Sequence, residues 1–509
     1  MKVTPPLPED ILEDSHHHRH WKIGPFRFRF SLENLRFGRG FTLRRFSIAE
    51  AAFLFMVAII ASHGLGVIRQ SIFNALFGTG PEANAYVAAF RLPSILFDLI
   101  AGGALTHAFI PIFISYEKEN GQREAWRLTS LIFNVLLVAL TATVLAGEFL
   151  APAFVNNLLV PGYSPSEQAL TTTLTRIMLI QPLILGLGTV ATAVLSGRRQ
   201  FLLPALSLAV YNFGLIGGLL FSLAIPQVGI YGPTFGTLAA AALQVLVQLP
   251  GLLKQGARYS FVWDFKHPGL RQILALLLPN VLTVIVTSSA FIVSTAFTSY
   301  FPDQASLAAQ HNAYMIYGLP LGLLAQAIAQ ATLPQFALLS ADRRYKDLQR
   351  TVLHVIAGSL LLTVPAALML WLLGKPAIYI FFQHGAFDEH SSDLTYIALI
   401  GYAVGLPGAT LGALLGRGFY ALKDAWTPLL LNILGAAASI SFIVLLLKIL
   451  AGSHVILAIP LAVSAAATIE ALLLCGLLFI VLRRKVKTEK CKQEDHPVNG
   501  QEEQQKEAQ

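Results

Sequence analysis

Six ionisable side chains interrupt long apolar stretches of this sequence, where such residues are rare. A charged side chain inside a bilayer costs a few kcal/mol or more, so the charges that persist there usually face a cavity or one another. The six residues are Arg69, Arg91, Asp98, His63, His107 and His311. A guanidinium fork matches phosphate oxygens, so the arginines predict an anion site, with Arg69 as its strongest candidate. Asp98, His107 and His311 are candidates for ion coupling, because carboxyl and imidazole groups change charge with a proton.

Each of these residues also has an ordinary structural explanation. Arg69 could extend from the end of a span to the membrane interface. Asp98 could neutralise an arginine of a neighbouring helix, and a single helix histidine is more often hydrogen-bonded in the core. Arg91 and Asp98 lie seven residues apart, about 10 Å along one helix face, which is too far for direct pairing. We expect three further charges to be satisfied by structural partners: Arg176, Glu148 and Glu470.

The elements that position these residues are membrane-spanning helices. Hydrophobic residues make up 55% of the 509 and charged residues 13%, whereas soluble domains carry about a quarter charged residues. The apolar stretches are long enough to cross ~30 Å of hydrocarbon. We predict about twelve spans, near residues 48–68, 84–115, 127–155, 169–196, 201–224, 229–253, 271–300, 306–339, 351–374, 392–415, 427–450 and 455–482. Their many prolines and glycines, Pro182 and Pro407 among them, predict bent or broken helices.

The basic residues between the spans predict the orientation. Fifteen Lys and Arg residues fall in the even-numbered loops, whereas odd-numbered segments such as 155–168 and 301–304 hold none. Because Lys and Arg accumulate on the cytoplasmic side, the even loops and both termini are expected to be cytoplasmic.

An internal repeat predicts two lobes. Phe90-Arg-Leu-Pro93 is echoed 227 residues later by Tyr317-Gly-Leu-Pro320, and Leu145-Ala-Gly147 by Leu372-Leu-Gly374 at the same displacement. Six spans in each copy give both copies the same orientation, related by an axis along the membrane normal. We therefore expect an all-α integral membrane protein with two pseudo-symmetric six-helix lobes around a central cavity. The predicted parts are a basic extension 1–46, an N-lobe 47–254, a cytoplasmic linker 255–270, a C-lobe 271–482 and a disordered charged tail 483–509.

Other functional classes are disfavoured by composition. The net charge of +8 lies in short clusters between spans and in the tails, which suits anionic lipid headgroups better than nucleic acid. The run from His16 to His20 is interpreted as a solvated tail, and two cysteines cannot form a usual zinc site, so no metal is predicted. Neither a nucleotide-binding loop nor a hydrolase motif occurs. We therefore predict no enzyme and no cofactor, and a transport cycle driven by an ion gradient or the membrane potential.

Several motifs carry a family resemblance. The stretch from Gly66 to Pro93, GVIRQSIFNALFGTGPEANAYVAAFRLP, closely resembles the opening of the MurJ/MviN lipid II flippases. The resemblance continues through residues 103–104, 108–111, 382–387 and 418–428, and covers roughly residues 50–480. It implies the two-lobed fold of the multidrug/oligosaccharidyl-lipid/polysaccharide exporters, a polyprenyl-pyrophosphate-linked glycan as substrate, and a bacterial cytoplasmic membrane as location.

The cavity positions implied by the resemblance depart from the family pattern. Matching by motif places His63 and Phe97 at arginine positions, Asn84 at an acidic position and about Met315 at another arginine position. Arg69 and Arg91 keep the positive charge, so the implied substrate site is Arg69, Arg91, His63 and Asn84. Two helices that commonly follow the twelfth span in the family have no counterpart in this sequence.

The leading hypothesis is an outward lipid II flippase working by alternating access. One rival is an exporter of another lipid-linked oligosaccharide or polysaccharide. The other is a non-transporting scaffold that recruits cell-wall synthesis proteins. Membrane lipids are partners in all three hypotheses.

Overall fold

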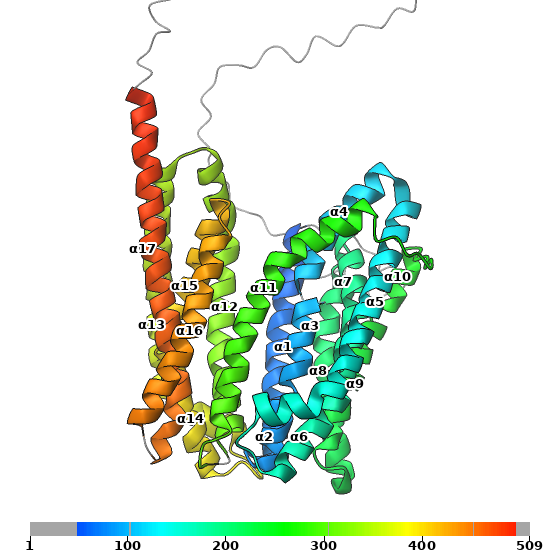
Figure 1. Cartoon of the computed structure of the whole chain (residues 1–509), viewed down its shortest axis with the longest axis vertical. Coiled ribbons are helices and arrows are strands. Elements are labelled where there is room, and N and C mark those ends of the chain that lie inside the picture. The colour runs from blue at the N-terminus through cyan, green and yellow to red at the C-terminus, as the bar shows by residue number, and fades with distance from the viewer. Residues whose placement is uncertain (1–47, 101–102, 304, 451, 495–509) are drawn as a thin grey trace, which may run out of the picture. The chain divides into compact units, whose positions relative to one another are not determined.

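The computed structural model describes residues 48–100, 103–303, 305–450 and 452–494, and all regular structure in these ranges is helical. The predicted extension 1–46 and the final residues of the tail lie outside this part of the chain. Helices of the first half are α1 (Ile48–Phe77), α2 (Pro81–Ala89), α3 (Arg91–Ile100), α4 (Gly103–Glu119), α5 (Gly121–Phe154), η3 (Val155–Leu159), α6 (Pro165–Met178), α7 (Ile180–Gly197), α8 (Leu202–Ala224), η4 (Pro226–Val228), α9 (Tyr231–Leu246) and α10 (Leu249–Lys254) (Figure 1). The second half contains α11 (Pro268–Thr298), α12 (Ser306–Ala341), α13 (Tyr345–Phe382), α14 (Glu389–Ala403), α15 (Leu406–Ala421), α16 (Trp426–Ile449), η5 (Gly452–Leu457) and α17 (Ala458–Glu494).

Within the described ranges, ten helices are long and apolar enough to cross a membrane, or eleven if the bent pair α14 and α15 forms one span. The eighth predicted span, near 306–339, corresponds to α12, which is a single helix of 36 residues but is not in that set. The helix is present as predicted, but the count of twelve spans is not confirmed.

Several spans are broken, as their proline and glycine content predicts. The pair α14 and α15 bends by 45° where Gly405 and Pro407 begin the second helix. The span near 169–196 consists of α6 and α7, with Pro182 in the first turn of α7. A proline in a helix interior removes a hydrogen bond and clashes with the preceding turn, so its position near a helix start avoids that cost. By contrast, α12 continues through Pro320.

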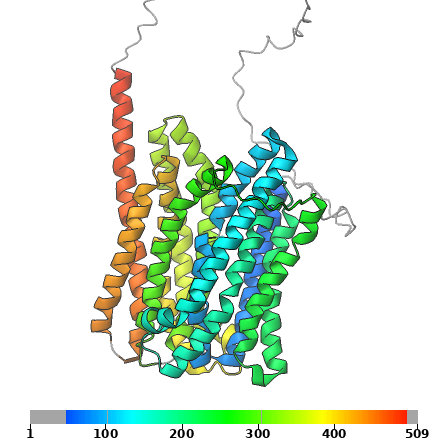
Figure 2. The ribbon, with the colours of Figure 1, turned by 45° about the vertical axis from the view of Figure 1, so that its right-hand side comes forward.

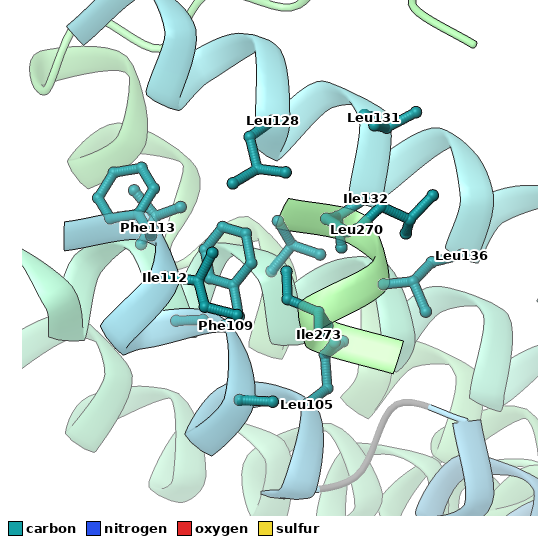
Figure 3. Close-up of a cluster of buried hydrophobic side chains, with 14 of the residues drawn as sticks. Leu105, Phe109, Ile112, Phe113, Leu128, Leu131, Ile132, Leu136, Leu270 and Ile273 are labelled. Carbon is teal, nitrogen blue, oxygen red and sulfur yellow. The ribbon is translucent and has the colours of Figure 1, made fainter. Parts of the chain in front are cut away.

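The first turns of α11 pack in the N-lobe core. Leu270 and Ile273 of α11 are 1% exposed and lie in a cluster with Leu105 and Phe109 of α4 and Leu128 of α5 (Figure 3). Further along, α11 contacts α16 of the second half. The predicted lobe boundary at residue 271 therefore falls inside a helix that connects both lobes, because apolar burial does not follow the repeat boundary.

The last helix is longer than its apolar stretch. The sequence predicts that helix ends at Leu482, whereas α17 continues to Glu494 and extends beyond its neighbours in both views (Figures 1 and 2). Lys, Arg, Glu and Gln are good helix formers, which explains how a charged segment continues the helix. The prediction of disorder from residue 483 is therefore wrong for residues 483–494.

Candidate functional site: a cavity between the lobes

A cavity of ≈ 580 Å³ lies among α1, α2, α3, α8, α9, α11 and α12. Its polar lining is Arg69, Gln70, Arg91, Ser94, Asp98, Thr287, Ser288 and His311. Four aromatic residues also line it: Phe73, Tyr86, Phe90 and Phe291. Binding sites commonly combine an apolar or aromatic wall with a few converging polar groups, and this cavity has that composition.

Two guanidinium groups from different helices face this cavity. Arg69 lies on α1 and Arg91 begins α3, and in the described part of the chain neither forms an ion pair with a carboxylate. The Nε of Arg91 is buried without a hydrogen-bond partner among the described residues, and its guanidinium lies 5.3 Å from the centre of the Phe291 ring. Buried donors normally have partners, so this group is available to an anionic ligand.

Asp98 shares the cavity with both arginines. It lies two turns after Arg91 on α3, so the two side chains are on one face, as their spacing predicts. No ion pair joins them in the described ranges. Two guanidiniums and one carboxylate leave the cavity with an excess of positive charge, which favours an anionic guest.

A second cavity of ≈ 210 Å³ extends from the first into the C-lobe. Arg91, His311 and Phe291 line both cavities, so these residues lie at their junction. The second cavity also reaches Tyr314 and Glu470. Arg91 and Tyr314 both line this second cavity, so the N-lobe arginine faces the C-lobe wall there.

Two predicted site residues, His63 and Asn84, lie outside the cavity lining. His63 is exposed on α1 and does not line the cavity. Asn84 is buried, and its Oδ1 accepts a hydrogen bond from the backbone N–H of Ala308 at 2.8 Å. It therefore satisfies a donor in the first turn of α12, where the N-cap residue Ala305 provides no side-chain bond. His107 lies on α4, but its side chain is outside the described part.

Polar side chains join the lobes beside the cavity. Gln70 Nε2 of α1 donates to Asn312 Oδ1 of α12 at 2.9 Å and to Asn74 Oδ1 at 3.1 Å. Asn312 Nδ2 donates to the same Asn74 oxygen at 3.3 Å. All three residues are buried. Sequence reasoning missed this network, although amides within apolar spans are themselves a signal that partners are required.

Backbone and hydroxyl contacts join the lobes on the side of the odd-numbered loops. The N–H of Ala386 in the C-lobe donates to the carbonyl of Ala75 in the N-lobe at 2.9 Å. The hydroxyls of Thr79 and Ser391 lie 2.7 Å apart across the same boundary. Ser391 also donates to Asp388 from its hydroxyl and its backbone N–H, which lowers the pKa of that carboxyl. Asp388 therefore stays ionised at neutral pH and fixes the start of α14.

Arg176 is partnered but not deeply buried. Its Nε lies 3.8 Å from Glu148 Oε2 and donates to the Glu148 carbonyl at 3.2 Å, whereas Glu470 belongs to the second cavity. The expected structural pairing is confirmed for Arg176 and Glu148. The side chains of Arg176 and Glu148 are 46% and 36% exposed. Neither charge is therefore buried deeply enough for its removal to cost much stability.

Replacement of Arg176 by alanine is expected to change stability little. An exposed ion pair contributes about 0–1 kcal/mol, so the midpoint of thermal unfolding in detergent should fall by no more than a few degrees. Transport per folded molecule should be unchanged. Glu148→Ala is the matched variant, and a large fall for either variant would contradict a surface pair.

Comparison with known proteins identifies the family. A family model described as lipid II flippase MurJ matches residues 73–493. The probable lipid II flippase MurJ of Rhizobium meliloti (strain 1021) is 28% identical over 403 residues, which cover 78% of this chain and 75% of that protein. The lipid II flippase MurJ of Burkholderia cenocepacia is 28% identical over 375 residues, with 72% of each chain covered.

Solved structures agree with this assignment. A lipid II flippase MurJ in an inward closed conformation aligns with a TM-score of 0.71 and 26% identity, covering 84% of this chain and 87% of that one. An inward-facing MATE family transporter of the MOP superfamily aligns with a TM-score of 0.70 at 15% identity, covering 86% and 99%, which concerns the fold alone. The chain belongs to the MurJ family of lipid II flippases, as a multi-pass membrane protein of the bacterial inner membrane.

Proposed function

We propose that this chain moves lipid II outward across the bacterial cytoplasmic membrane, with its pyrophosphate held by Arg69 and Arg91. The observation that carries this proposal is the pair of guanidiniums that face one cavity between the lobes and have no acidic partner among the described residues. Arginine forks suit phosphate oxygens bidentately. Aromatic side chains beside them, such as Tyr86 and Phe90, provide flat apolar surfaces against which sugar rings can pack.

Contacts between the lobes on one side of the cavity support alternating access as the mechanism. Contacts between Ala75 and Ala386 and between Thr79 and Ser391 join the lobes on the side of the odd-numbered loops. A cavity closed on that side receives its ligand from the other, so outward transport requires these contacts to break. We propose that the lobes rock between a state with these contacts formed and a state with them broken. Asp98 and His311, which lie beside the arginines, are the candidates for ion coupling. No catalytic step is part of this cycle.

We propose that the even-numbered loops and both termini are cytoplasmic, and that the linker 255–270 joins the lobes on that side. The structure suggests better reporter positions than Ser164 and Asp303, because Ser164 caps α6 and Asp303 bonds His390 at 2.7 Å. Cysteines at the neighbouring exposed residues Ser166 and Pro302 should react with an impermeant thiol reagent on intact cells. A cysteine at Lys346 should react only after permeabilisation, and its labelling in intact cells would exclude this orientation.

Complementation of a flippase-depleted bacterium tests the function. The full-length protein is expected to restore growth and cell shape, and a variant lacking residues 1–46 and 495–509 should do so as well. Rescue lost only with the tails would instead favour a scaffold for cell-wall synthesis proteins. Failure of both proteins at normal membrane levels would favour export of another lipid-linked glycan.

A further inference from the structure

The segment 257–267 between the lobes carries an exposed row of aromatic side chains. It forms no helix, and four aromatic residues alternate along it: Tyr259, Phe261, Trp263 and Phe265. Their exposed fractions are 63%, 76%, 41% and 64%, whereas the residues between them are less exposed. Alternation with a period of two is typical of an extended chain with one face against the protein and one face away from it.

Polar contacts fix this segment against α5. The Ser260 N–H donates to Ser130 Oγ at 3.1 Å, and Asn134 Nδ2 donates to the Val262 carbonyl at 3.1 Å. The Tyr259 hydroxyl donates to Asn134 Oδ1 at 2.8 Å. The segment is therefore attached at one level of α5, between residues 130 and 134.

The rings of Phe261, Trp263 and Phe265 form a continuous row, whereas the ring of Tyr259 packs against Phe133 of α5. The rings of Phe261 and Trp263 are 5.9 Å apart, and those of Trp263 and Phe265 are also 5.9 Å apart. Such pairs are stabilising, so the row is held together while its outer face stays uncovered by the described part of the chain. Exposed aromatic surface of this extent indicates an interaction site.

The charges of α5 give the depth of this row in the membrane. After Arg127, α5 has no Asp, Glu, Lys or Arg until Glu148. The intervening residues 128–147 span about 30 Å, the thickness of the hydrocarbon core. Arg127 therefore marks the edge of the hydrocarbon, and Ser130 and Asn134 lie within about 10 Å of it.

We propose that segment 257–267 lies in the boundary between headgroups and acyl chains of the cytoplasmic leaflet and binds anionic phospholipid there. This inference uses the orientation proposed above. Tyr and Trp favour this boundary, and an extended backbone requires the water that is present there but absent deeper in the bilayer. The exposed basic residues Arg258, Lys266 and Arg271 lie along the same segment and at the start of α11, where they complement phosphate groups.

Fluorophore quenching tests the depth. The native cysteines are replaced (Cys475→Ser, Cys491→Ser), and a fluorophore is attached at Phe261→Cys in the full chain, in vesicles of phosphatidylcholine and phosphatidylglycerol. Shallow nitroxide lipids should quench it several-fold more than aqueous acrylamide does. A matched label at Lys346→Cys, in the loop after α12, should show the reverse. Acrylamide quenching at 261 equal to that at 346 would overturn the proposal.

A second measurement tests the anionic lipid, and it is independent of transport. Adding phosphatidylglycerol should raise the midpoint of thermal unfolding of the wild-type chain, and Arg258→Gln with Lys266→Gln should remove most of that rise. Lys346→Gln with Arg350→Gln serves as the matched pair and should retain it. An unchanged rise in the first variant would overturn the lipid-phosphate contact. Neither the quenching experiment nor the thermal experiment measures flipping. Each can therefore fail while the complementation test succeeds, and the reverse.

Discussion

An Arg69→Ala protein is expected to insert and fold normally but to lose most of its transport. A charge facing a cavity contributes little packing, so its removal should not lower the yield. A hydrogen bond from a charged donor contributes about 1.5–3 kcal/mol, so loss of the fork should weaken binding of a lipid pyrophosphate about 10- to 150-fold. Binding to the purified protein and complementation at equal membrane levels measure the effect. Arg69→Lys keeps the charge without the fork and should be intermediate.

Matched variants separate this role from general damage. Arg91→Lys should also reduce binding, because a lysine cannot reproduce the Nε donor that lies buried beside the ring of Phe291. Arg127→Ala removes an exposed arginine whose partner is Glu124, three residues earlier on α5, and should leave transport unchanged. Normal transport by a well-expressed Arg69→Ala protein would show that the headgroup is held elsewhere, and the pyrophosphate site would be abandoned.

Four cavity residues could be predicted from the sequence, because burying an ionisable side chain in a bilayer is costly. Arg69, Arg91, Asp98 and His311 come from three helices, yet all four line one cavity. The physical reason is general, because a charge in the membrane must face polar surroundings or a partner. The same reasoning correctly expected a partner for Arg176, but not how exposed the pair would be. Distance along a span does not give depth when the helix is tilted or broken.

Predictions that rested on motif position were less successful. His63 and Asn84 were included because they occupy positions where the resembling family has charged residues. The structure turns Asn84 toward the first turn of α12 and His63 toward the outside of α1. The amide of Asn84 carries no charge that must face the cavity, so its position in a motif does not determine where its side chain points. The helices themselves were predicted well, since long apolar stretches admit few alternatives in a bilayer.

Contacts between the lobes could not be predicted from the sequence. The network of Gln70, Asn74 and Asn312 joins residues more than 230 positions apart. The closing contact between Ala75 and Ala386 uses backbone atoms, which carry no sequence signal of their own. The sequence does contain two glycines beside the backbone contact, Gly78 and Gly385, but their role is visible only when the two lobes lie against each other.

A Gly385→Ala protein is expected to favour the state that is open to the outside. Gly385 has φ +60 and Gly78 has φ +58, and a Cβ at either residue would collide with a backbone carbonyl of the other lobe, Ala75 or Ala386 respectively. Neither carbonyl is the end of a flexible side chain, so the lobes must separate to relieve the collision. A difference of about 1.4 kcal/mol would change the ratio of the two states tenfold. Labelling of a Ser94→Cys reporter in the cavity by an impermeant thiol reagent from outside should accelerate accordingly.

Two other glycines isolate the collision from backbone strain. Gly229 and Gly452 also have positive φ, at +52 and +63, but nothing lies within 4 Å of a Cβ built on either one. Gly229→Ala and Gly452→Ala therefore carry positive-φ backbone strain of about 1–3 kcal/mol without touching the opposite lobe. They should lower the thermal midpoint as much as Gly385→Ala and leave the labelling rate of the reporter unchanged. If Gly385→Ala labels no faster than Gly452→Ala, the close backbone approach at Ala75 does not hold the outer end shut, and the polar network around Gln70 must do so instead.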